Sequence, residues 1–345
     1  MHSRKKFDSH FVLRTAAAGL ISACWLQPTV AVASADEVED QAQASWRANM
    51  AAIEVPAEGC FHAAYPNLFW ERVACGAGQP RTHSLPRKVK EGASDVVGNG
   101  HDYAAGVSGL ISKAFGTFPS VTGVTKEKSV GVAAFGGGGI LGSNEYTLQL
   151  NTNFLNTTSA CDGHSGCSVW QQFIYSTDYL REGEADVFMQ YWLIGWGNSA
   201  CPAPFASDGE GDCYANSSYV KVPDLKITDL AGETLTASVV SGGNDTVTFT
   251  YGGDSYSVSG LDSKLGIATV WDQAEFNVVG DAGGSRANFN TGSSVTVDIA
   301  VTSGTTAKPS CVKNGGTTGE TNNLDLGKCT ATGGATPAIE FTESN

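Results

Sequence analysis

The stretch DTVTFTYGGDSYSV, Asp245–Val258, decides the fold class of this chain. Apolar and polar residues alternate on both sides of Gly252-Gly253, and a period of two is the pattern of a half-buried β-strand. A Gly-Gly pair between two such runs is typical of a tight hairpin turn. The stretch therefore predicts two antiparallel strands joined by a short turn.

Runs of the same kind recur along most of the chain. They cover residues 101–109, 110–121, 130–135, 146–151, 168–176, 187–196, 234–240 and 295–301. Glycine is abundant, at 42 of 345 residues, and long helical periodicity is scarce. We therefore expect an all-β domain of ten or more strands, and this number suits a two-sheet jelly-roll sandwich better than several small domains.

The N-terminal segment, residues 1–35, has the features of a secretory signal peptide. Basic residues precede the apolar run Thr15–Leu26, and Ala33-Ser34-Ala35 fits a small-residue cleavage site. The apolar run is too short to span a membrane comfortably. An alternative is a lipoprotein box at residues 21–24, which would leave Cys24 lipidated. We expect secretion, with lipid attachment through Cys24 as the alternative.

A lead-in, residues 36–95, separates the signal peptide from the β-sandwich domain, which we expect over residues 96–345. Trp46, Met50 and Ile53 have helix-compatible spacing and predict a short N-terminal helix. The rest of the lead-in is proline-containing and reads as a looped segment. It is either a removable pro-segment or a permanent part of the domain.

The negative charge of the chain argues against nucleic acid and anionic membranes as partners. The formal net charge is −14, and removing residues 1–35 takes away four basic residues and one acidic residue, which leaves −17. An acidic surface of this kind disfavours nucleic acid and anionic membranes as partners. We expect a monomer.

The cysteines predict a disulfide framework. Besides Cys24 there are eight, an even number, which fits an oxidising compartment. Pairing of neighbours along the chain gives Cys60–Cys75, Cys161–Cys167, Cys201–Cys213 and Cys311–Cys329. Zinc binding by Cys161, His164 and Cys167 is the alternative, although the spacing is poor for a structural zinc site. We expect no metal.

Candidate catalytic residues are carboxylates and amides, because the sequence contains neither a nucleophile elbow nor a His-Glu-x-x-His zinc motif. Glu275 interrupts an apolar, strand-like run between Ala274 and Phe276. It is either a structural residue on an amphipathic strand or a catalytic acid. Gln171 and Gln172 are adjacent in another apolar strand, so their side chains must point to opposite faces. At least one of them therefore lies on a packed or cleft face, where its amide needs partners.

Possible binding residues follow in the next run. Gln190 is another side-chain amide within an apolar strand. Tyr191, Trp192 and Trp196 could form a binding platform, or each could belong to the core.

Four stretches resemble segments of the glutamic peptidases, the eqolisins, in the same order. They are DYAAGV (102–107), FGTFPSV (115–121), WQQFIY with MQYWLIGW (170–196), and AEFNVVGDAGGSRANF (274–289). The resemblance spans about residues 100–300. It departs from the family where Tyr191, not a glutamate, precedes Trp192, and the terminal cysteine pairs have no counterpart.

The resemblance implies a concanavalin A-like β-sandwich that hydrolyses peptide bonds in acid and requires no metal or cofactor. The family's catalytic glutamate falls on Glu275, and its glutamine falls on Gln172, or on Gln171 if the register slips by one. Together they would activate water, and Gln190, Tyr191, Trp192 and Trp196 would bind the polypeptide substrate. The alternative is a concanavalin-like secreted protein that binds or degrades glycans.

Overall fold

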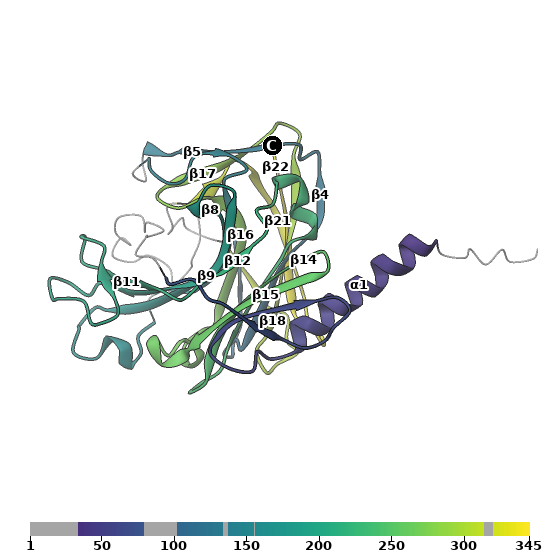
Figure 1. Ribbon diagram of the computed structural model, residues 1–345. Coiled ribbons are helices and arrows are strands. Elements are labelled where there is room, and N and C mark those ends of the chain that lie inside the picture. Colours follow the sequence, from purple (N-terminus) through teal and green to yellow (C-terminus); the bar gives the residue numbers. More distant parts are fainter. Residues whose placement is uncertain (1–33, 79–101, 134–136, 155, 314–319) are drawn as a thin grey trace, which may run out of the picture.

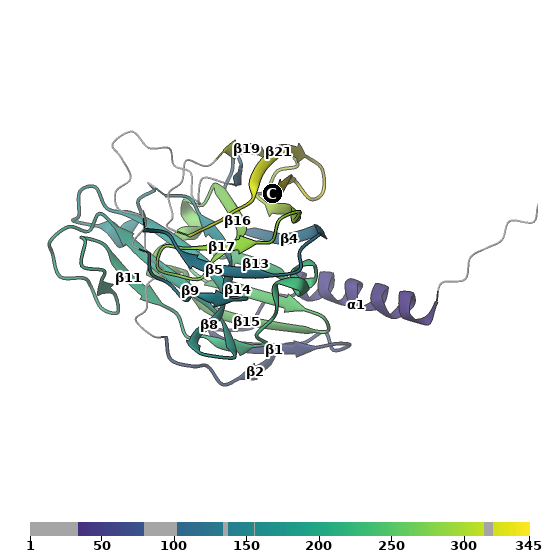
Figure 2. The same ribbon diagram turned by 90° about the horizontal axis from the view of Figure 1, so that it is seen from above.

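The computed structural model describes residues 34–78, 102–133, 137–154, 156–313 and 320–345. Two large antiparallel sheets form a β-sandwich, as the strand pattern predicted (Figures 1 and 2). One sheet has the order β2 (Glu71–Val73), β1 (Gly59–Ala64), β15 (Asp254–Leu261), β14 (Asn244–Tyr251), β13 (Thr234–Val239), β4 (Lys113–Thr122), β18 (Ser294–Thr302), β22 (Ala338–Ser344) and β21 (Asp325–Thr332). We call it the first sheet.

The second sheet supports the candidate site. Its order is β10 (Ala206–Ser207), β11 (Cys213–Asn216), β9 (Glu184–Ile194), β8 (Ser168–Arg181), β7 (Tyr146–Thr152), β16 (Gln273–Gly280), β3 (Tyr103–Gly106) and β19 (Ser310–Lys313), with β12 (Val220–Val222) also paired to β9. A third, small sheet lies at one end of the sandwich (Figure 1, top) and has the order β20 (Thr321–Asn322), β17 (Ser285–Phe289), β5 (Glu127–Gly131) and β6 (Gly142–Ser143). Short 3₁₀ turns connect some strands: η2 (Ser159–Cys161), η3 (Ile227–Gly232), η4 (Asp262–Lys264) and η5 (Ile267–Thr269).

The hairpin predicted at 245–258 is formed by β14 and β15. The two strands pair from Asn244 with Leu261 to Tyr251 with Asp254. Gly252 in the turn has φ of +56°, a backbone conformation that glycine adopts without steric cost. The hairpin therefore lies inside the first sheet.

The core fills the space between the two large sheets. Alternate residues of each strand point inward, as the period of two requires. Tyr175 stacks on Phe249 with 4.2 Å between ring centroids, and Phe276 packs against Phe118 at 5.0 Å. The Phe276 ring also covers Gly116, where an added Cβ would lie 2.2 Å from a ring carbon.

Helix α1 (Ala35–Ala52) confirms the helical spacing of the lead-in. Ser34 accepts a hydrogen bond from the backbone of Glu37 and forms a capping box with it. Trp46 and Met50 are buried and pack on Ala63 of β1. The N-terminal part of the helix projects away from the sandwich (Figures 1 and 2).

The rest of the described lead-in contains two strands, whereas the sequence predicted a looped segment. β1 pairs with β15 over six residues, and β2 pairs with β1. Residues 59–73 therefore extend the first sheet, and removing them would expose the edge of β15. The expected signal peptide, Cys24 and the boundary between residues 95 and 96 lie outside the described residues, apart from Ser34 and Ala35.

The four predicted disulfides are confirmed. Cys60–Cys75, Cys161–Cys167, Cys201–Cys213 and Cys311–Cys329 are bonded. Cys161 and Cys167 are therefore not free to bind zinc, and the zinc alternative is wrong. Four disulfides fit an oxidising, extracellular environment. In the described part of the chain, no helix is long and apolar enough to cross a bilayer.

Candidate active site

A row of polar side chains crosses the second sheet. Glu275 of β16 lies opposite Asn151 of β7, which lies opposite Gln172 of β8. The row continues through Gln190 of β9 to Asn216 of β11. Directly opposed residues point to the same face of a sheet. These five side chains, which we call the polar row, therefore share the face that points away from the first sheet.

Glu275 lies at one end of the polar row and is almost fully buried from solvent. It is 2% exposed, and its Oε2 accepts a hydrogen bond of 2.6 Å from Asn151 Nδ2. The buried carboxyl of Asp102, just before β3, is its second hydrogen-bond partner. Burial, then the neighbouring Asp102, raise the pKa of Glu275 well above its usual range. A hydrogen bond between two carboxyls requires at least one proton, so the pair retains a proton when it forms.

Gln172 occupies the middle of the row and is held by two neighbours. Its Nε2 donates to Gln149 Oε1 at 3.0 Å, and its Oε1 accepts from Trp192 Nε1 at 3.2 Å. Two strand spacings separate the backbones of Gln172 and Glu275, about 10 Å. Asn151 lies between them. The structure therefore places both predicted catalytic residues on one face, with an amide that the sequence analysis did not select between them.

The far end of the row is a continuous hydrogen-bond chain. Trp192 Nε1 also donates to Gln190 Oε1 at 3.0 Å, and Gln190 Nε2 donates to Asn216 Oδ1 at 2.7 Å. These bonds fix the orientation of each amide.

An aromatic row runs beside the polar row. Trp170 of β8 lies opposite Trp192 of β9, which lies opposite Tyr214 of β11. Phe154 completes the group and packs on Trp170 with 4.6 Å between ring centroids. All four side chains are buried.

Some polar atoms on this face have no hydrogen-bond partner among the described residues, and two of them lie near the candidate site. They are Asn151 Oδ1 and Trp170 Nε1, and both are buried. Buried polar atoms are almost always paired, so an acceptor and a donor left over on one face require an explanation. Both belong to the region where the polar and aromatic rows meet.

Three other predicted residues lie away from the polar row. Gln171 points between the sheets, where its Nε2 lies 3.6 Å from Met189 Sδ. Tyr191 also points into the core, and Lys264 Nζ lies 4.6 Å from its ring centre. Trp196 follows β9 and stacks on His164. Of the four predicted binding residues, only Gln190 and Trp192 share the face of Glu275.

Asp102 and Asn151 are not among the site residues predicted from the sequence. The alternation of residues 146–151 does place Gln149 and Asn151 on one polar side of a strand. No local signal shows that β7 lies between β16 and β8, because Asn151 and Glu275 are 124 residues apart.

Other buried carboxyls lie elsewhere in the sandwich. Burial raises the pKa of Glu343 to about 8, and the nearby Asp102 adds to the shift. Glu233 also has a pKa of about 8, chiefly because of burial, and its Oε1 accepts a 2.6 Å bond from Tyr146. The described residues contain no cluster of three or more metal-ligating side chains.

Comparison with known proteins gives only distant similarities. No protein-family model matches the chain, and no curated protein matches it significantly. A crystal structure of scytalido-glutamic peptidase with a transition-state analogue inhibitor aligns with a TM-score of 0.29 and 12% identity, over 69% of this chain and 96% of that one. The κ-carrageenase of Pseudoalteromonas carrageenovora, solved with a tetrasaccharide of κ-carrageenan, aligns with a TM-score of 0.24 and 7% identity, over 70% of this chain and 66% of that one. These values are too low to establish a common function.

Proposed function

We propose that this protein is a secreted acid endopeptidase of glutamic-peptidase type, with Glu275 as its acid–base residue. The observation that supports this most is the polar row. Buried Glu275 accepts a hydrogen bond of 2.6 Å from Asn151. It lies on the same face of the sheet as Gln172, and strand pairing aligns both residues with Asn151. An acid–base residue works best when its pKa lies near the working pH, and displaced pKa values cluster at functional sites.

In the proposed reaction, ionised Glu275 takes a proton from a water molecule. The hydroxide adds to the peptide carbonyl carbon, and the second N–H of the Gln172 amide donates to the oxyanion that forms, while Asn151 stays bonded to Glu275. Protonated Glu275 then gives its proton to the leaving amine as the C–N bond breaks. Asp102 holds the proton shared by the carboxyl pair, so Glu275 can be ionised while the pair still carries one proton. The reaction should fail when both carboxyls are protonated.

The aromatic row is the proposed binding surface. Trp192 links it to the polar row through the bonds from its Nε1 to Gln172 and Gln190. Since Trp170 Nε1 has no partner among the described residues, a substrate carbonyl could accept from it. Every member of both rows is buried or partly buried, so a substrate must displace whatever covers this face.

Glycan hydrolysis is the second candidate, and the Asp102–Glu275 pair is the observation that favours it. Glycosidases use two carboxyls, which in the retaining type are about 5–5.5 Å apart, whereas Asp102 and Glu275 are hydrogen-bonded to each other and therefore lie closer together. The amides of Asn151 and Gln172 favour the peptidase, because a glycosidase needs no amide beside its carboxyl pair.

A substrate comparison tests the proposal. We expect the purified chain to cut denatured casein in a series of assays over about pH 2–7, with the rate rising as Glu275 ionises, and Glu275→Gln to abolish the cleavage. Glu340→Gln, which changes an exposed glutamate of β22, is the matched control and should cut normally. Cleavage by Glu275→Gln at the wild-type rate would refute the proposal. Release of reducing sugar from a polysaccharide, with casein left intact, would favour the glycosidase.

A further inference from the structure

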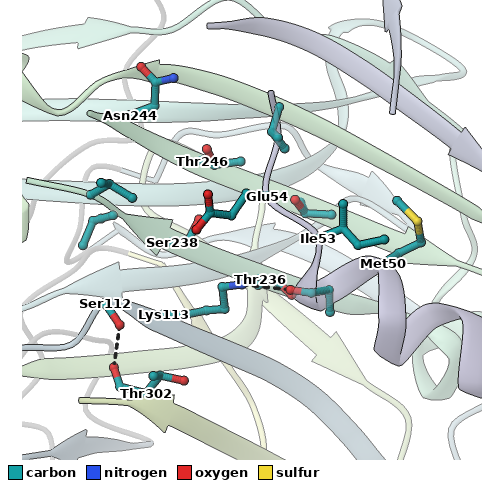
Figure 3. Close-up of a pocket in the computed structure, with 15 residues that line it drawn as sticks. Met50, Ile53, Glu54, Ser112, Lys113, Thr236, Ser238, Asn244, Thr246 and Thr302 are labelled. Atoms are coloured by element: carbon teal, nitrogen blue, oxygen red, sulfur yellow. Dashed lines mark hydrogen bonds between the residues drawn. The ribbon is translucent and has the colours of Figure 1, made fainter. Parts of the chain in front are cut away.

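A cavity of about 350 Å³ lies on the outer face of the first sheet, on the other sheet from the polar row (Figure 3). The segment that follows α1 forms one wall, with Ile53 and Glu54. Ser112, Lys113 and Thr302 form another wall, and β13 and β14 provide the floor. Sites for small molecules have volumes of about 300–1,000 Å³, so the cavity has room for one small ligand.

The floor of this cavity is a lattice of hydroxyl groups. Thr236 and Ser238 of β13 lie opposite Thr248 and Thr246 of β14, respectively. The lattice continues to β15, where Thr246 Oγ1 donates to Ser259 Oγ at 3.1 Å. Core residues alternate with these hydroxyl residues, so the hydroxyls form a flat polar surface with regular spacing.

Part of the hydrogen-bonding capacity of the lattice is unused. Among the described residues, no partner is found for the hydroxyls of Thr236 and Ser238 or for the side-chain amide of Asn244, and all three line the cavity. A hydroxyl can donate once and accept twice, and an amide can do both. The floor therefore presents donors and acceptors mixed at short intervals.

The charges at the cavity balance. Lys113 Nζ donates to the Ala51 carbonyl at 3.0 Å, and Glu54 faces it across the cavity (Figure 3). Burial lowers the pKa of Lys113, while the carboxylate of Glu54 opposes that shift. One carboxylate and one ammonium leave no net charge. A single carboxylate is also a poor cation site.

We propose that this cavity binds a neutral polyhydroxylated ligand, a saccharide unit. Each sugar hydroxyl is both donor and acceptor, which matches the mixed groups of Thr236, Ser238 and Asn244. Glu54 adds a charged acceptor, and charge-assisted bonds are stronger than neutral ones. Ile53, which is partly exposed, supplies an apolar wall for the C–H face of a sugar ring.

Saturation-transfer NMR with glucose, galactose, xylose and their oligosaccharides tests the site. We expect wild-type protein to bind at least one of these probes, and Thr236→Val with Ser238→Ala to weaken binding about tenfold or more. Thr250→Val, which changes the same lattice outside the cavity, should bind as wild type does. Glu54→Gln, in an exposed segment, provides a second variant if the double variant fails to fold.

Two results would overturn the proposal. One is the absence of saturation transfer from the wild-type protein to every probe, which would make the cavity a hydrated gap under the segment after α1. The other is equal binding by wild type and the folded variants, which would place the sugar elsewhere. Glu275→Gln should leave saccharide binding unchanged, so this test and the peptidase test can fail separately.

Discussion

Replacing Glu233 by glutamine should flatten the dependence of stability on pH. Glu233 lies between the sheets, 1% exposed, and Tyr146 donates to its Oε1. Its folded-state pKa is about 8 against a usual value of 4.5. The folded state therefore keeps a proton that the unfolded chain releases over this window. Stability from this group is fully present below about pH 4.5 and is lost as pH rises towards 8.

The magnitude follows from the size of the shift. One pKa unit corresponds to about 1.4 kcal/mol, so the folded state loses roughly 3 kcal/mol at pH 7 and about 5 kcal/mol above pH 8 relative to pH 4. Glutamine stays neutral and can keep the bond from Tyr146. The glutamine Nε2 takes the place of Glu233 Oε2, which has no hydrogen-bond partner among the described residues. The amide N–H groups of the variant are therefore as unpaired as the O–H group of the protonated glutamate. We therefore expect wild type and Glu233→Gln to unfold with similar free energies at pH 4, with the variant more stable at pH 7.

Denaturant unfolding, followed by tryptophan fluorescence with the disulfides intact, measures this difference at each pH. Glu182→Gln, in an exposed turn, is the control and should follow the wild-type curve. If Glu233→Gln and wild type lose stability in parallel between pH 4 and pH 8, then Glu233 is not the proton-binding group that we infer.

Two further changes test the site and the core. Asn151→Ala removes the 2.6 Å hydrogen bond to Glu275, so cleavage should slow by about tenfold or more. The acid limb of the pH–rate profile should also move to higher pH, because ionised Glu275 loses a hydrogen-bond donor. An unchanged profile would contradict this role of Asn151. Gly116→Ala forces a methyl group against the Phe276 ring and should cost about 1–3 kcal/mol in urea unfolding. Gly253→Ala, whose added Cβ would lie 3.3 Å from its nearest neighbour, should cost less, and equal losses would show that the contact with Phe276 is relieved without strain.

Local patterns predicted much of the fold. Alternation located the hairpin of β14 and β15, and the spacing of Trp46 and Met50 located α1. Each disulfide joins neighbouring cysteines, the pairing that sequence order favoured. These features depend on residues that are close together in the chain.

The site depends on residues that are far apart, and the sequence predicted less of it. Strand order decides that Asn151 lies between Glu275 and Gln172, and no short pattern encodes that order. The period of two does carry one further constraint. Tyr191 and Trp192 are adjacent in a strand, so they point to opposite faces and cannot share one binding platform. The structure places Tyr191 in the core and Trp192 beside the polar row.

In the proposed reaction Glu275 and Gln172 act as one hydrolytic unit, and kcat/KM for a single peptide substrate tests this most directly. The rates to compare are those of wild type, Glu275→Gln, Gln172→Ala and the double variant. Residues that act together give losses that do not add, so we predict that the double variant is no slower than Glu275→Gln alone. A Glu275→Gln enzyme with the wild-type kcat/KM, or losses that simply multiply, would contradict the account.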